Sequence, residues 1–127
     1  MTAVPYRILV TGSRTWDDTD TICDALDTAV SEVPPHTRDL WLVVGDCPTG
    51  ADRIAYQWAT TAMVPIDAHI ADWTTHGKAA GPIRNAAMVR SGADVVLAFI
   101  KDGSRGASHT VALARRAGIP VRLWTRP

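Results

Sequence analysis

Four segments of the chain combine glycines with side chains that can bind anions, and each follows a run of apolar residues. They are TGSRTW (11–16), GDCPTGAD (45–52), HGKAAGPIRN (76–85) and DGSRGASH (102–109). Glycine lets the backbone approach an anion closely, and the first N–H groups of a following helix can bind a phosphate. If the apolar runs are parallel strands, all four segments meet at one edge of a sheet, where open α/β folds bind ligands. The pattern predicts a phosphate-binding cleft.

The first segment follows a short apolar run at residues 7–11. Gly12 and Ser13 lie where a first βα turn would meet a phosphate, and Arg14 could pair with that phosphate through two hydrogen bonds. A tight βα turn needs glycine for steric reasons alone, so this segment by itself is a weak signal. Trp16 is open to two interpretations, since it could stack on a base or cover the end of a helix.

The second segment has glycines at both ends of a loop that leads into a predicted helix. In the functional interpretation, the N–H groups around Thr49, Gly50 and Ala51 bind a phosphate, and Asp52 accepts a ribose hydroxyl or positions a water. In the alternative, Asp52 merely stabilises the positive end of the helix dipole. Cys47 is interpreted as a packed residue, because no histidine in the segment is placed to activate it as a nucleophile.

The third segment places His76, Lys78 and Arg84 beside Gly77 and Gly81. Two cations next to residues that allow a close approach suit a ligand with two negative charges. Arg84 is expected near the start of a helix, where a cation is unfavourable unless an anion compensates it. His76 alone could equally be a surface residue.

In the fourth segment, Gly103 and Gly106 flank a turn that opens another predicted helix, with Ser104, Ser108 and His109 as donors or acceptors. This is the shape of an anion-binding nest. No GK[ST] follows, and the GxGxxG spacing is incomplete, which weakens the case for an ATPase or an ordinary dinucleotide-dependent dehydrogenase.

Strands and helices must alternate to bring these segments together. Apolar runs predict strands at 7–11, 40–45, 66–71, 93–100 and 121–124, and helical spacing with caps predicts helices at about 19–33, 51–63, 82–91 and 107–117. This order favours a doubly wound parallel α/β sheet of about five strands with helices on both faces. The most apolar run, 93–100, is expected at the sheet centre and 66–71 at an edge. Residues 72–82 are expected to form a long polar loop.

Composition narrows the function classes. The 127 residues fit one domain, 1–127, and 13 Lys and Arg balance 13 Asp and Glu, so the chain lacks the basic field of a dedicated nucleic-acid binder. No acidic residue follows Asp102, whereas several arginines do. Because of this basic C-terminal part, single-stranded DNA binding stays a third possible function. Two cysteines without metal spacing predict neither a metal site nor a disulfide scaffold. With no export signal or membrane-spanning run, we expect a cytoplasmic protein without membrane contact.

The strings RILVTGSR, GDCPTGADRIA, HGKAAGPIRNAAMV, GADVVLAF and GSRGASHTVALA resemble, in this order, the SLOG superfamily, named for its Smf/DprA and Lonely Guy members. Within it, the chain is similar to the small YpsA/YspA-related family of bacteria and phages. The resemblance implies a Rossmann-like domain that binds nucleotides or nucleotide-derived molecules, with NAD and ADP-ribose derivatives as the usual suggestion. It also implies a homodimer or higher homo-oligomer, for which Trp41, Trp58 and Trp124 offer a hint as large apolar surface.

Lonely Guy enzymes cleave the N-glycosidic bond of a nucleoside monophosphate with an arginine in R-K-x-x-M and a glutamate in P-G-G-x-G-T-x-x-E. The string from Arg84 to Met88 is similar to the first motif, so the resemblance assigns Arg84 to the arginine. The second motif aligns loosely with residues 103–107, but the glutamate is missing, and Thr110 follows three residues after Ala107. Hydrolysis would need Asp46, Asp52 or Asp72 to enter from another loop.

The leading hypothesis is therefore a module that senses or sequesters a phosphate-bearing nucleotide, such as ADP-ribose or an NAD derivative, with no cofactor. The alternative is an N-glycosidase of the same ligand, with Arg84, Asp52 and Asp72 as the candidate catalytic residues. The candidate ligand-binding residues are Gly12, Ser13, Arg14, Gly45, Asp46, Thr49, Gly50, Ala51, Asp52, His76, Gly77, Lys78, Gly81, Arg84, Asn85, Gly103, Ser104, Arg105, Gly106 and His109.

Overall fold

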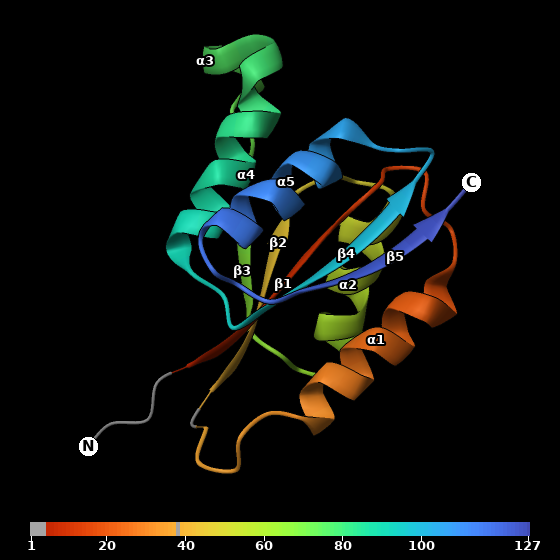
Figure 1. Ribbon diagram of the computed structural model, residues 1–127, viewed down its shortest axis with the longest axis vertical. Helices are drawn as coiled ribbons and strands as arrows, with labels where there is room; N and C mark the ends of the chain where they lie inside the picture. Colours follow the sequence, from red (N-terminus) through yellow and green to blue (C-terminus); the bar gives the residue numbers. More distant parts are fainter. Residues whose placement is uncertain (1–4, 38) are drawn as a thin grey trace.

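A computed structural model describes residues 5–37 and 39–127, and in them five strands form one all-parallel sheet (Figure 1). The sheet order is β3-β2-β1-β4-β5. The strands are β1 (Tyr6–Gly12), β2 (Leu40–Gly45), β3 (Ile66–His69), β4 (Val95–Lys101) and β5 (Val121–Arg126). The prediction of a doubly wound α/β sheet is confirmed. Residues 1–4 and 38 of the predicted domain lie outside the described residues.

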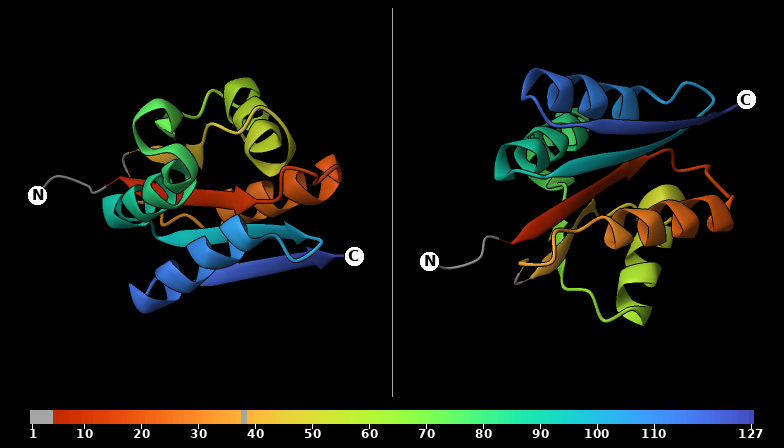
Figure 2. Two further views of the ribbon diagram at one scale, coloured as in Figure 1. Left: turned by 90° about the horizontal axis from the view of Figure 1, so that it is seen from above. Right: turned by 60° about the horizontal axis from the view of Figure 1, so that its bottom comes forward.

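Helices cover both faces of the sheet, as Figure 2 shows. The helices α1 (Thr19–Ser31) and α2 (Gly50–Thr61) pack on one face, and α4 (Ala80–Ser91) and α5 (Arg105–Arg116) pack on the other. Successive strand residues point to opposite faces. Accordingly, Ile8 and Val10 of β1 belong to the core under α1 and α2, whereas Leu9 belongs to the core under α4 and α5.

The central strand is β1, which pairs with β2 on one side and β4 on the other. The prediction that residues 93–100 lie at the centre is therefore wrong by one strand. Strands β1 and β4 are both covered by helices on both faces, so the apolar character of a strand does not reveal which of them is central. The prediction of an edge strand in the 66–71 run is confirmed, because β3 pairs with β2 alone.

The helices that follow the neighbouring strands β1 and β4 lie on opposite faces of the sheet. The position between these two strands is therefore the topological switch point of the sheet. From β1, the chain passes through α1 to β2, whereas α5 follows β4 on the opposite face of the sheet. Ser13 joins the ends of these strands through hydrogen bonds: its N–H donates to the Phe99 carbonyl at 2.9 Å, and its Oγ accepts from the Lys101 N–H at 2.8 Å. A crevice outside the carboxyl ends of such strands is the usual ligand site of open α/β sheets.

Residues 73–82 of the segment 72–82 are helical, so the segment is not the long polar loop that its composition suggests. It contains α3 (Trp73–His76), the 3₁₀ turn η1 (Gly77–Ala79) and the start of α4, two residues before Pro82. Asp72 begins α3, since its Oδ1 accepts a hydrogen bond from the Thr75 N–H at 3.0 Å. The segment projects as a helical arm beyond the sheet edge (Figure 1).

Three of the five tryptophans are held by contacts within the domain. Trp16 is only 2% exposed, and its ring meets the Phe99 ring edge to face with centroids 5.5 Å apart. Of its two interpretations, a covering residue therefore fits, and a ring that stacks on a base does not. Trp124 stacks on the Phe99 ring with centroids 4.9 Å apart, and Trp58 Nε1 donates to Asp27 Oδ1. Two of the three tryptophans that hinted at self-association therefore have partners within the chain.

Candidate functional site

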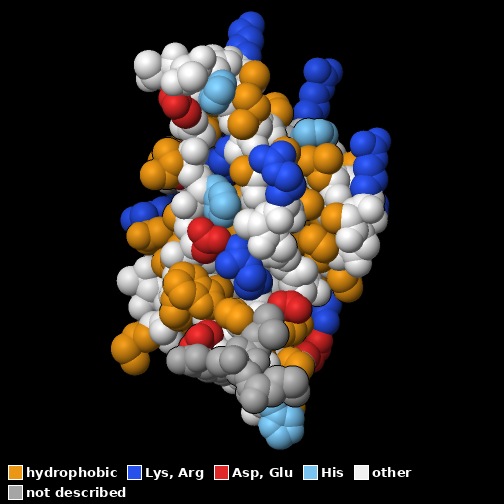
Figure 3. Space-filling view, turned by 90° about the vertical axis from the view of Figure 1, so that its left-hand side faces the viewer, with side chains coloured by type: hydrophobic (Ala, Val, Ile, Leu, Met, Phe, Trp, Pro, Cys, Tyr) orange, Lys and Arg blue, Asp and Glu red, His pale blue; other side chains and the backbone are white. Residues whose placement is uncertain are grey.

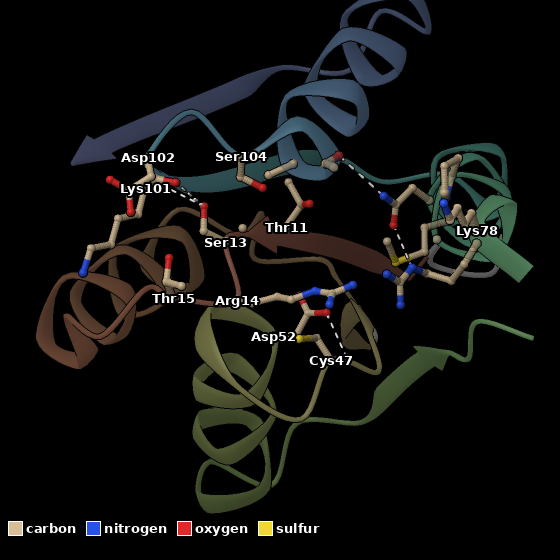
Figure 4. A pocket seen from close by; sticks show the side chains of 18 of the residues that line it. Thr11, Ser13, Arg14, Thr15, Cys47, Asp52, Lys78, Lys101, Asp102 and Ser104 are labelled. Atoms are coloured by element: carbon tan, nitrogen blue, oxygen red, sulfur yellow. Dashed lines mark hydrogen bonds between the residues drawn. The ribbon is translucent and has the colours of Figure 1, made fainter. Parts of the chain in front are cut away.

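A pocket of about 620 Å³ opens at the carboxyl ends of β1 and β4 (Figure 4). All four predicted segments contribute to its wall. Of the predicted ligand-binding residues, those that line it are Gly12, Ser13, Arg14, Asp52, Lys78, Gly81, Arg84, Asn85, Ser104 and Gly106. The structure thus brings together half of the candidate set, drawn from segments that span most of the chain.

The last residue of β1, Gly12, is packed too tightly to admit a side chain. A Cβ added to Gly12 would lie 2.5 Å from the Phe99 carbonyl oxygen and would also meet the Ala51 side chain. The Ser13 side chain is buried, and its hydroxyl donates to the Lys101 carbonyl at 3.0 Å as well as accepting from the Lys101 N–H. Ser13 therefore joins β1 to β4, and Arg14 is the side chain of the turn after β1 that extends across the pocket (Figure 4).

The start of α2 is docked on the same turn, which engages the Ala51 N–H and the Thr49 hydroxyl. The Ala51 N–H donates to the Ser13 carbonyl at 3.2 Å, and Thr49 Oγ1 donates to the Arg14 carbonyl at 3.1 Å. Gly50 has a φ of +71°, and a Cβ there would meet the Ser13 carbonyl oxygen. Because these groups hold the β1 turn in place, we leave Thr49, Gly50 and Ala51 out of the proposed phosphate contacts.

The side chains of Asp52 and Arg84 both lie next to Gly45, whose lack of a side chain leaves space for them. A Cβ added to Gly45 would lie 2.6 Å from Arg84 Nη1 and 2.8 Å from Asp52 Oδ2. Burial of Asp52 raises its pKa from 3.8 to about 6, although the charge of Arg84 and a hydrogen bond from the Cys47 N–H both act in the opposite direction. The pocket wall therefore holds a carboxyl group that changes its protonation close to neutral pH.

Arg84 has partners within the protein. Its Nη1 donates to Asp46 Oδ1 at 2.7 Å, and its Nε donates to Asn85 Oδ1 at 2.7 Å. The anion that compensates this cation near the start of α4 is therefore, at least in part, Asp46. These contacts hold the guanidinium in place beside the pocket, with its side chain only 12% exposed.

The first turn of α5 opens onto the pocket without a side-chain cap. Ser104 occupies the N-cap position but makes no side-chain hydrogen bond to the turn in the described part of the chain, and Ser104, Gly106 and Ala107 line the pocket. By contrast, Asp18 caps α1 through the Thr21 N–H. The first N–H groups of a helix have no partner within the helix and carry its positive dipole end. At α5 they are available to an anion.

Other predicted residues lie apart from this pocket. His76 and Asp72 line a separate hollow of about 170 Å³, and the exposed Arg105 and His109 on α5 do not line the main pocket. Hydrogen bonds from Thr75 lower the pKa of Asp72, as expected for a helix cap. The remaining predicted residues outside its lining are Gly45, Asp46, Thr49, Gly50, Ala51, Gly77 and Gly103.

Sequence reasoning missed nine residues that line the pocket. They are Thr11, Thr15, Cys47, Trp73, Pro82, Met88, Lys101, Asp102 and Ala107. Lys101 and Asp102 directly follow the apolar run of β4, so their position at the strand end was a usable signal. Trp73 gave no such signal, because only the helical arm brings it to the pocket.

Thr110 stands where the resemblance to Lonely Guy enzymes would place a glutamate. Its side chain is buried, and its hydroxyl donates to the Gly106 carbonyl one turn earlier in α5 at 3.1 Å. This position therefore supplies no carboxylate to the pocket. Asp52 and Asp102 line the pocket and could serve in its place.

The all-parallel sheet with helices on both faces and a pocket at the carboxyl ends of β1 and β4 defines a Rossmann-like α/β protein. Residues 6–76 match the family model described as the YspA, cpYpsA-related SLOG family, and the chain belongs to this family. The Gene 61 protein of Mycobacterium phage D29 is 44% identical over 120 residues, which cover 91% of this chain and 93% of that protein. No solved structure matches the chain. Membership of the SLOG family indicates a nucleotide-related binding or enzymatic role.

Proposed function

We propose that this protein binds a phosphate-bearing nucleotide or nucleotide-derived ligand, such as ADP-ribose or an NAD derivative, and thereby senses or sequesters it. The observation that carries the proposal is the uncapped first turn of α5, which opens onto a 620 Å³ pocket at the switch point of the sheet. Its N–H groups and dipole would bind one phosphate. A pocket of this volume has the size of a small-molecule site.

Two cations that line the pocket, Arg14 and Lys78, are placed to neutralise such a ligand. Among residues 5–37 and 39–127, neither Arg14 nor Lys78 forms an ion pair, and both line the pocket. Lys101 and Arg84, in contrast, are paired with Asp17 and Asp46. We therefore assign charge neutralisation to Arg14 and Lys78, and we assign to Asp52 a hydrogen bond with a ribose hydroxyl.

A second candidate is an N-glycosidase acting on the same ligand, and the properties of Asp52 favour it. A carboxyl group with a pKa of about 6 can act as a general base or acid near neutral pH. The guanidinium of Arg84, held next to Asp52, could stabilise negative charge that develops on a leaving or transferred group. We assign no catalytic role to Asp72, which caps α3 and does not line the main pocket.

Thermal unfolding with a ligand panel tests the proposal and separates the two candidates. The panel consists of AMP, ADP, ADP-ribose, cyclic ADP-ribose and NAD, and each mixture is then analysed by chromatography. A ligand at 100 times its Kd stabilises the native state by about 2.7 kcal/mol, so Tm should rise by several degrees. Arg14→Ala should reduce this rise, whereas the exposed Arg115→Ala, at the far end of α5, should not.

The products decide between binding and catalysis. Intact ligand after a clear rise in Tm supports the binding module, and a released free base supports the glycosidase. No rise with any member of the panel would contradict both candidates.

Self-association stays a prediction. Ile70, directly after β3, and Ile83 of α4 are exposed apolar side chains that line the same hollow. Figure 3 views the molecule from the left-hand side of Figure 1, where hydrophobic side chains are interspersed with basic, acidic and histidine side chains. None of the described helices is long and apolar enough to cross a membrane.

A further inference from the structure

A second cavity of about 320 Å³ adjoins the main pocket, and we refer to the two cavities as the two lobes of the site. Arg14, Cys47, Trp73 and Arg84 line both cavities, so the two share a wall. Asp46 and Pro48, from the loop after β2, line the second lobe but not the first. The phosphate-binding turn of α5 lines the first lobe alone. The two lobes therefore offer different chemistry to the two ends of one ligand.

Trp73 is the large aromatic side chain at the junction of the lobes. It begins α3 and is 49% exposed, although it lines a concave wall. A Cβ added to Gly81 would lie 3.5 Å from Trp73 Cη2, so the indole ring lies against the first turn of α4 and is supported there. A supported ring with an exposed surface is a platform on which a heteroaromatic base can stack.

Asp46 adds a polar group to the second lobe. Its Oδ1 accepts hydrogen bonds from Arg84 Nη1 at 2.7 Å and from the Ala71 N–H at 3.4 Å. Its Oδ2 makes no hydrogen bond with any residue in 5–37 or 39–127, and the side chain is 33% exposed. This oxygen can accept a hydrogen bond from an amino group on a base.

We propose that the second lobe is a base-binding subsite, in which a nucleobase stacks on Trp73 and donates a hydrogen bond to Asp46 while the phosphates bind at the start of α5. The inference rests on the proposed function and narrows its ligand class. The ligand must carry both a heteroaromatic base and a phosphate. A sugar phosphate would fill the first lobe alone.

Calorimetric titration with two probes tests this subsite. ADP-ribose carries a base, and ribose 5-phosphate does not. Trp73→Ala should weaken ADP-ribose binding about tenfold or more, which corresponds to about 1.4 kcal/mol, and should leave ribose 5-phosphate binding unchanged. Trp73→Phe should retain most of the affinity, because it keeps an aromatic face. Tyr56→Ala is the matched control, since Tyr56 is also a half-exposed aromatic but lies on α2 outside both lobes.

Tryptophan fluorescence gives an independent measurement on the same variants. ADP-ribose should quench the emission of the wild-type protein, and the quenching should largely disappear in Trp73→Phe. Equal ADP-ribose affinity in the wild type and Trp73→Ala, or an equal loss for both probes, would overturn the base subsite while leaving the phosphate site standing. Binding of ribose 5-phosphate without binding of ADP-ribose would also overturn the base subsite and leave the phosphate site standing. Failure of the wild type to bind either probe would refute the subsite and contradict the proposed function as well.

Discussion

Replacing Ser104 with aspartate is expected to stabilise the fold and to abolish ligand binding. Ser104 stands at the N-cap of α5 and makes no side-chain cap bond among the described residues. An aspartate there can accept hydrogen bonds from the first turn and interact favourably with the helix dipole, which should add about 1 kcal/mol of stability. The same carboxylate would occupy the N–H groups assigned to the phosphate and would repel it. We expect at least a hundredfold weaker binding, which corresponds to about 2.7 kcal/mol.

Urea unfolding and calorimetric titration with ADP-ribose measure the two effects of Ser104→Asp. Ser108→Asp is the matched control, because it adds the same charge one turn further along α5 at an exposed position that does not line the pocket. It should weaken binding far less. If Ser104→Asp bound ADP-ribose with wild-type affinity, the phosphate would not lie at the start of α5.

The second large effect concerns the pH dependence of stability in Asp52→Asn. The native pKa of Asp52 is raised from 3.8 to about 6, so the native state holds this proton more tightly than the unfolded state does. The stabilisation of the native state by the protonated Asp52 carboxyl is therefore fully present below about pH 4. It is lost as the pH rises through 6. Asparagine does not titrate. The free energy of unfolding of Asp52→Asn relative to the wild type should increase by about 3 kcal/mol between pH 3 and pH 7.

Urea unfolding at several pH values follows this difference. Asp72→Asn provides a control of opposite sign, since hydrogen bonds lower the pKa of Asp72, and its contribution is lost as the pH falls below 3.8. Relative to the wild type, the stability of Asp72→Asn should therefore fall as the pH rises. A difference for Asp52→Asn that does not change between pH 3 and pH 7 would show that burial leaves the Asp52 carboxyl unperturbed.

The layout of the fold could be predicted because it depends on local patterns. Runs of apolar residues and the turns that follow them indicated the strands and the doubly wound order. The central strand could not be identified this way, because helices cover both faces of β1 and β4. The helical arm at 73–79 was missed because its polar composition resembles a loop, and its start depends on the Asp72 cap.

Ten of the candidate ligand-binding residues line the pocket, because each segment followed a strand whose end had to reach the same sheet edge. The roles of individual groups were harder to predict. The Ala51 N–H and the Ser13 hydroxyl have the chemistry of phosphate ligands, but both are used to dock the β1 turn. Likewise, Arg84 suggested an anionic ligand, yet Asp46 already pairs with it. Such pairings connect residues distant in the sequence, and spacing alone cannot reveal them.

Backbone amide NMR during titration with ADP-ribose tests the central claim most directly. If the ligand phosphate binds at the uncapped start of α5, the largest chemical shift changes should fall on Arg105, Gly106 and Ala107, with further changes in the turn around Arg14. The N–H groups near the C-terminal end of α5, at Arg115 and Arg116, should change little. Saturable shifts confined to another surface, or the absence of any shift at millimolar ADP-ribose, would contradict the claim.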